Sequence, residues 1–289
     1  METKVSNINI NIFKELEVKT PELWEQAEQK YPKIKKWLVG EDFPTYNQLT
    51  DLSKIFHIPF GYFFLDKLPE RKYPIPHYRT SQNAEFVPSL DLIETVEFAQ
   101  QIQSWAKYIL TEFGNEELPF CGKYSTKNSV EEIVNKLVEI FGENYFGNTF
   151  GETFKNLVEK AENNGIFVLI NSVVGNNTRR KLDVTEFRGF VLYDPIAPVV
   201  FINNNDAISA KIFTLIHEVV HILIGKSASF DLQDLMSADN EIEKFCDRCT
   251  AEFLVPKTTL ERKYDYQKDL DELAKYFKVS KIVILRRLL

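Results

Sequence analysis

The segment Phe213–His221, FTLIHEVVH, carries the residues best suited to chemistry. His217 and His221 are four residues apart, so on a helix both imidazoles lie on one face, within reach of a single metal ion. Glu218 borders that face, and nearly all other nearby residues are apolar, which predicts a buried helix. Burying two imidazoles and a carboxylate without partners would cost several kcal/mol, and a metal ion would offset that cost.

The alternative interpretation of this segment is structural. Two core histidines could be satisfied by backbone carbonyls, with Glu218 paired to a lysine or arginine elsewhere in the chain. A metal centre instead requires a third ligand, because a catalytic zinc takes three protein ligands and keeps a fourth position for water. The sequence downstream of His221 is therefore decisive.

Glu243 is our candidate for the third ligand. It lies in the predicted helix 240–255, and Asp247 follows one turn later on the same face, placed to accept the outer N–H of a ligating histidine. Glu241 is the competing ligand, less favoured because no acidic residue lies four positions after it. The donor types predict one zinc ion per chain, held by His217, His221 and Glu243.

Peptide hydrolysis is the chemistry that such a site would support. Zinc would lower the pKa of a bound water, and Glu218 would accept the proton as catalytic base and pass it to the leaving amine. For the group that stabilises the oxyanion, position alone suggests Arg188, Tyr264 and Tyr266.

The Cys246-x-x-Cys249 pair could bind zinc or exchange disulfides. In the middle of a helix that spacing gives poor disulfide geometry, so we interpret both residues as small apolar groups on the inner side of the helix. A redox protein is the alternative. The three cysteines, with Cys121, cannot all pair, and METKVSNINI lacks the pattern of a secretory signal, so we expect a cytoplasmic protein.

The elements around the motif predict an α+β fold with a small three-stranded sheet packed on helices. Short β-branched and aromatic runs at 166–172, 186–194 and 198–204 read as strands, and buried helices follow at 206–224 and 240–255. Amphipathic runs upstream predict helices at 89–113, 129–142 and 153–165. The strand at 198–204 could present an edge to a peptide substrate or be a core strand, and the polar run 172–183 reads as a connection that could also shape substrate entry.

Length and composition set the domain organisation. With 289 residues, of which 44% are hydrophobic, the chain can bury a large core and has room for flanking modules. We predict four parts: a helical module at 1–70, a proline-rich connector at 71–88, a catalytic domain at 89–256 and a small helical module at 257–289.

Charge argues against nucleic acid or an anionic membrane as the main partner. The net charge is -7 and the pI is near 5.4, so the chain as a whole repels phosphates. Residues 1–75 hold 11 Lys and Arg against 11 Asp and Glu, so the N-terminal module has no excess positive charge either. We expect that module to bind protein rather than DNA, and no segment is long and apolar enough to span a membrane.

Three segments together resemble the ImmA/IrrE family of bacterial metallopeptidases. They are PVVFINNND, FTLIHEVVH and EIEKFCDRCTAEFLVP, in this order, within a match over roughly residues 150–256. The chain departs from the family in having Asp247 where Asn is common. It also has Cys246, Cys249 and Thr250 where the family is usually richer in Ala and Phe. The resemblance implies a zincin-like fold, with the carboxylate ligand on the second helix.

The resemblance also extends to the flanks and implies a role. The run KIKKWLVGEDFPTYNQLTDLSKIFHIPFGYFFL looks like the second half of a repressor-type helix-turn-helix, and LDELAKYFKVSKIVILRRLL resembles the module after the peptidase core. Family members cut a helix-turn-helix repressor once, in stress-response, mobile-element or phage-defence circuits, and some are encoded beside toxins. The alternative is a non-catalytic or antitoxin-type regulator that binds a protein partner through the same fold.

Overall fold

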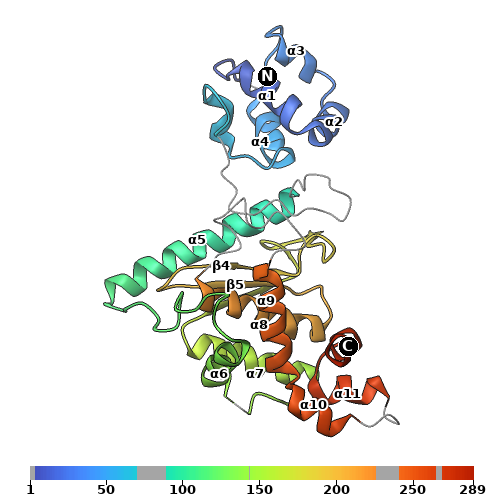
Figure 1. Ribbon diagram of the computed structural model, residues 1–289. Coiled ribbons are helices and arrows are strands. Elements are labelled where there is room, and N and C mark those ends of the chain that lie inside the picture. The colour runs from blue at the N-terminus through green and yellow to red at the C-terminus, as the bar shows by residue number, and fades with distance from the viewer. Residues whose placement is uncertain (1–3, 70–88, 143, 226–240, 265–268) are drawn as a thin grey trace. The chain divides into compact units, whose positions relative to one another are not determined.

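The computed structural model describes residues 4–69, 89–142, 144–225, 241–264 and 269–289 (Figure 1). Its internal contacts divide the chain into two compact units, Met1–Lys72 and Tyr73–Leu289. The predicted connector at 71–88 lies outside the described residues.

The first unit is helical. It contains α1 (Ile10–Lys19), α2 (Pro21–Lys30), α3 (Ile34–Leu38), α4 (Tyr46–Ile55) and a 3-10 helix, η1 (Phe60–Phe64). These elements enclose a core of their own, in which the largest fully buried side chains are Phe13, Trp37, Phe56 and Phe63.

A proline separates two helices of the first unit. α2 ends at Lys30 and α3 begins at Ile34. Tyr31, which precedes Pro32, is extended with φ -130° and ψ 79°. A residue before proline avoids the helical region, so the break follows from Pro32.

The second unit is built around a three-stranded sheet, which confirms the α+β class. The strands are β1 (Phe167–Asn171), β4 (Gly189–Leu192) and β5 (Val199–Asn203), in the order β1-β5-β4. β5 pairs parallel to β1 and antiparallel to β4. β5 is therefore the central strand and is buried along its length, so it is the core strand of the two alternatives and offers no edge to a peptide.

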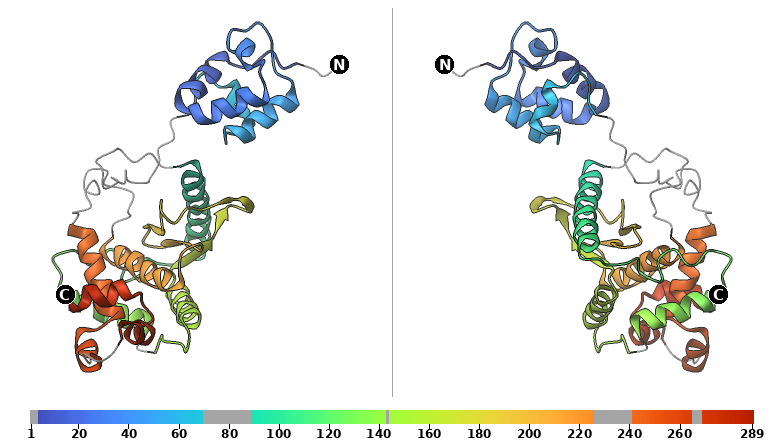
Figure 2. Two further views of the ribbon diagram at one scale, coloured as in Figure 1. Left: turned by 90° about the vertical axis from the view of Figure 1, so that its right-hand side faces the viewer. Right: turned by 90° about the vertical axis from the view of Figure 1, so that its left-hand side faces the viewer.

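Helices cover both faces of this sheet (Figures 1 and 2). Side chains of β5 alternate: Val199 and Phe201 pack with α5 (Leu90–Glu112), whereas Val200 and Ile202 pack with α8 (Ile208–Ile224). α7 (Phe150–Asn163) adjoins β1 and α8. The sheet is thus the middle of three layers, and α8 lies directly against it.

A hairpin accompanies the sheet where the sequence predicted a polar connection. β2 (Val173–Val174) pairs antiparallel with β3 (Asn177–Lys181) around a turn at Gly175. β3 reads NTRRK and is largely exposed, so it has no apolar alternation that would have revealed a strand. Arg180 ties β3 to α5 through ion pairs with Asp91 and Glu94.

The remaining helices complete the second unit. α9 (Glu241–Leu254) packs against both α8 and α6 (Val130–Phe141), and three short helices follow: α10 (Lys257–Lys263), α11 (Leu270–Phe277) and α12 (Lys281–Leu288). Buried residues of α11 and α12 belong to the same hydrophobic cluster as those of α8 and α9. None of the described helices is both long and apolar enough to cross a membrane.

Candidate metal centre

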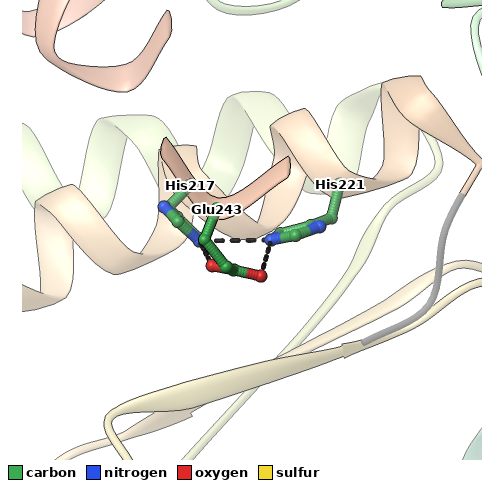
Figure 3. Close-up of side chains that lie close together, drawn as sticks. All are labelled: His217, His221 and Glu243. Atoms are coloured by element: carbon green, nitrogen blue, oxygen red, sulfur yellow. Dashed lines mark hydrogen bonds and ion pairs between the residues drawn. The ribbon is translucent and has the colours of Figure 1, made fainter. Parts of the chain in front are cut away.

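Two helices bring the predicted ligands together. α8 is buried over most of its length because its residues are apolar on all sides but one, and that side carries His217 and His221. α9 packs along α8 and supplies Glu243 from its first turn. Figure 3 shows the carboxylate of Glu243 facing both imidazole rings.

The three side chains converge on one point. The carboxylate of Glu243 lies 3.0 Å from Nε2 of His217 and 3.2 Å from Nε2 of His221. The two Nε2 atoms are 3.2 Å apart, and one ligand atom from each residue falls within 4.8 Å of the others. Glu241 is exposed and is not part of this cluster, so the geometry favours Glu243 of the two carboxylates considered.

Asp247 orients the first histidine. Its Oδ1 atom lies 3.1 Å from Nδ1 of His217, close enough to accept a hydrogen bond from the Nδ1–H group, and a neutral ring in that tautomer has its lone pair on Nε2. Burial by itself would lower the pKa of His217, but the hydrogen bonds to Asp247 and Glu243 outweigh it and raise that pKa to about 10. The surroundings of His217 therefore favour positive charge.

The pKa of Glu243 shows the complementary effect. Burial would raise this pKa, yet hydrogen bonds from His217 and His221 hold it far below the ordinary range of a glutamate. A carboxylate kept ionised beside two imidazoles is a stable anionic ligand.

The donor set fits a zinc ion. The Nε2 atoms of His217 and His221 are 3.2 Å apart, and they would repel each other if both presented lone pairs. A metal cation bound by both lone pairs removes that repulsion. Two imidazoles and one carboxylate are also a ligand set of catalytic zinc sites, which leave a fourth position for water. Nδ1 of His221 is buried with no hydrogen-bond partner among the described residues, so His217 alone has its outer nitrogen fixed by a carboxylate.

Glu218 lies beside this cluster on α8. Its side chain is buried, and burial raises its pKa, while the nearby His217 and His221 oppose that shift. It is not one of the three clustered ligands, so its carboxylate remains available for proton transfer next to them.

The two cysteines of α9 lie in the hydrophobic core. Cys246 and Cys249 are fully buried and form no disulfide. Burial raises the pKa of both thiols, that of Cys249 to about 12. Since the thiolate is the reactive form, these thiols are poor redox groups, and the interpretation as packing residues agrees with the structure.

Two of the three residues considered for oxyanion stabilisation are among the described residues. Arg188 is largely exposed, and its guanidinium lies 3.6 Å from Asp206. Tyr264 is partly buried against the main hydrophobic cluster, and Tyr266 lies outside the described residues.

The sequence analysis did not identify one buried cation near the centre, Lys211. Lys211 lies two turns before Glu218 on the same side of α8, and its Nζ atom donates to Oδ1 of Asn204 at 2.6 Å. Burial lowers its pKa. A lysine inside a largely apolar helix was the signal that could have identified it.

Comparison with known proteins covers the segment that contains the centre. A search of curated proteins finds no match to the chain. Residues 161–289 match the family model described as the IrrE N-terminal-like domain, Peptidase_M78. This range includes α8, α9 and every residue of the cluster. The part of the chain that carries the centre is therefore similar to the ImmA/IrrE family, and the similarity supports a metallopeptidase type of function.

Proposed function

We propose that this protein is a zinc-dependent endopeptidase. The observation that carries the proposal is the convergence of His217, His221 and Glu243, with Glu218 beside them on the same buried helix. The similarity of residues 161–289 to a peptidase family also supports it. The zincin-like arrangement, with two ligands on one helix and the third on the next, is part of the same proposal.

Each residue has a separate task in this proposal. His217, His221 and Glu243 would hold the zinc ion, and Asp247 keeps His217 in the tautomer whose Nε2 is free to bind. When bound, zinc supplies Lewis-acid activation of water and of a peptide carbonyl. Glu218 takes a proton from the attacking water as the new C–O bond forms, and then delivers it to the amide nitrogen as the C–N bond breaks.

A regulatory protein is the substrate that we propose, specifically a helix-turn-helix repressor. The support is the resemblance of the motif segments to the ImmA/IrrE family, together with a helical first unit that has its own core and no excess positive charge. That unit would bind the protein partner rather than DNA. Three cysteines, all buried and unpaired, are compatible with our placing this activity in the cytoplasm.

The experiment compares new protein N-termini in cells that express the wild type or Glu218→Gln. Glutamine is similar in size but cannot accept the proton, so the variant should fold and keep its zinc while losing cleavage by about two orders of magnitude or more. We expect a small number of new N-termini with the wild type, among them one in a repressor. Purified repressor mixed with each protein then confirms a single cut by mass spectrometry.

Two outcomes would contradict the endopeptidase proposal. The same cleavage by Glu218→Gln would show that Glu218 is not the base, or that another protease acts. A wild-type protein that holds zinc and binds the repressor without cutting it would favour a regulator that works by binding its partner.

A further inference from the structure

A pocket of about 830 Å³ lies in the second unit, among side chains outside the metal centre. It is formed by α6, described residues of the loop between α6 and α7, the end of α9, and the short helices α10 and α11. Its size is within the range of pockets that enclose small organic molecules.

Aromatic rings make up much of its wall. Tyr145 stacks on Phe253 with ring centroids 4.9 Å apart, and on Phe146 at 4.3 Å. Phe146 and Tyr276 remain 43% and 50% exposed, so both rings keep accessible surface at the pocket, and Nζ of Lys263 lies 4.8 Å from the ring centroid of Tyr276. Rings held in this way offer stacking surface to a planar ligand at little entropic cost.

Among the described residues of the pocket, the charged side chains are positive. Arg262 and Lys278 line it, and none of its described lining residues is acidic. Neither cation forms an ion pair with a described residue: Arg262 donates to Thr258 and Thr259, and Lys278 donates to the carbonyl of Lys275. In a chain with net charge -7, two cations without carboxylate partners at one pocket indicate an anionic occupant.

Lys278 occupies a costly backbone position. It ends α11 with φ 56° and ψ 37°, the left-handed region that glycine adopts freely and a lysine adopts at a cost. Residues held in such conformations cluster at functional sites. A lysine at a helix end where glycine would fit better is a second observation at this pocket, independent of its shape. Its Nζ atom donates to the carbonyl of Lys275 and lies 5.8 Å from the ring centroid of Phe150.

Two glycines constrain the backbone at the opposite wall of the pocket. Gly142 has φ 70° and ψ 170°, a region open almost solely to glycine. At Gly147 a Cβ atom would lie 2.4 Å from Cβ of Glu152. Tyr145 is anchored between them by a hydrogen bond to the carbonyl of Phe253. The aromatic wall is therefore preformed.

We infer that this pocket binds a small aromatic anion, whose ring stacks on Phe146 and Tyr276 and whose carboxylate, sulfonate or phosphate meets Arg262 and Lys278. The inference rests on no feature of the metal centre. It therefore stands or falls separately from the peptidase proposal.

The test uses two probes of one shape and different charge, 1-naphthylacetate and the neutral 1-naphthylacetamide, titrated into the full-length protein by calorimetry. The anion should bind once per chain. The amide should bind at least roughly tenfold more weakly, as expected when charge-assisted hydrogen bonds are lost. Arg262→Gln and Lys278→Gly should each lower the affinity for the anion by roughly tenfold and leave the affinity for the amide unchanged.

The variants include their own checks on folding. Lys278→Gly relieves the left-handed backbone, so its melting temperature should not fall below that of the wild type. Arg286→Gln removes an exposed arginine of α12 that does not line the pocket and should change neither probe. Any of three outcomes would overturn the inference. They are equal affinity for the two probes, an anion affinity unchanged by Arg262→Gln and Lys278→Gly, and no anion binding at millimolar concentration.

Discussion

His217 is held between two carboxylates, one at each ring nitrogen. Glu243 faces Nε2 and Asp247 faces Nδ1, at 3.0 and 3.1 Å. The two carboxylates differ in task. Glu243 also lies 3.2 Å from Nε2 of His221, whereas Asp247 contacts His217 on the side of the ring away from the cluster. This division of roles can be tested one residue at a time.

Replacing Asp247 should weaken zinc binding without abolishing it. Loss of an outer hydrogen-bond partner typically costs 10- to 100-fold in metal affinity, so we expect a fall of about that size in Asp247→Ala. Asp247→Asn keeps an oxygen acceptor for the Nδ1–H group and should lose less. Competition with a chromophoric chelator measures both affinities. An unchanged affinity in Asp247→Ala would show that the hydrogen bond to His217 does not support the metal.

The thiols should be inert in the folded protein. Cys121, Cys246 and Cys249 are all buried, and burial raises the pKa of each. We expect no alkylation by iodoacetamide at pH 8 under native conditions, and three modifications per chain in denaturant, counted by mass spectrometry. Rapid native labelling of Cys246 or Cys249 would revive the redox interpretation.

At the scale of elements, α8 is fixed at its C-terminal end by a close approach of two glycines. Gly225 caps the helix with φ 74°, and a Cβ atom placed there would lie 2.6 Å from the Cα of Gly122. The amide of Gly122 also donates to the carbonyl of Ile222 in the last turn. His221 precedes Gly225 by one turn, so this contact helps position a ligand.

Gly225→Ala should therefore destabilise the protein more than its backbone angle alone explains. The left-handed conformation costs an alanine about 1 to 2 kcal/mol, and the clash with Gly122 adds to it. Gly114→Ala is the matched control, because Gly114 has φ 75° and open space around its Cα. Urea unfolding gives both free energies. Equal losses in the two variants would mean that the glycine contact does not constrain α8.

The elements nearest the metal centre were predictable because their patterns are strong. The apolar run around His217 predicted a buried helix that α8 matches to within two residues, and α9 is similarly close. The three strands were visible as short β-branched runs, but their order was not, because pairing partners are distant in sequence. Hence the central place of β5 came only from the structure.

Other features left no local signal. The exposed strand β3 and the pocket of Arg262 and Lys278 depend on residues whose types are ordinary on a surface. The pocket in particular joins residues from 134 to 278, and only folding brings them together. The convergence of His217 and Glu243 was foreseen from motif spacing, while its distances required the packing of α9 on α8.

At the scale of the whole molecule, each of the two units has a hydrophobic core of its own. Phe13 and its neighbours form the core of the first unit, and the clusters on both faces of the sheet belong to the second. Separate cores predict separate unfolding transitions, because each unit buries apolar side chains of its own.

A core substitution should therefore act on one transition only. Phe13 is fully buried, and Phe13→Ala should destabilise the first unit by about 3 to 5 kcal/mol while the transition of the second unit stays in place. Added zinc should raise only the transition of the second unit, since a ligand stabilises the unit that binds it. Scanning calorimetry measures both effects. A single transition that shifts as a whole in both experiments would show that the units unfold together.

The central claim is that His217, His221 and Glu243 hold one zinc ion. Metal content by plasma mass spectrometry tests it on the wild type and on three variants: Glu243→Ala, Glu241→Ala and Glu218→Gln. The account predicts about one zinc per chain, lost in Glu243→Ala and retained in the other two, because only Glu243 belongs to the cluster. Wild-type protein without metal after zinc reconstitution, or zinc that persists in Glu243→Ala and leaves with Glu241→Ala, would contradict it.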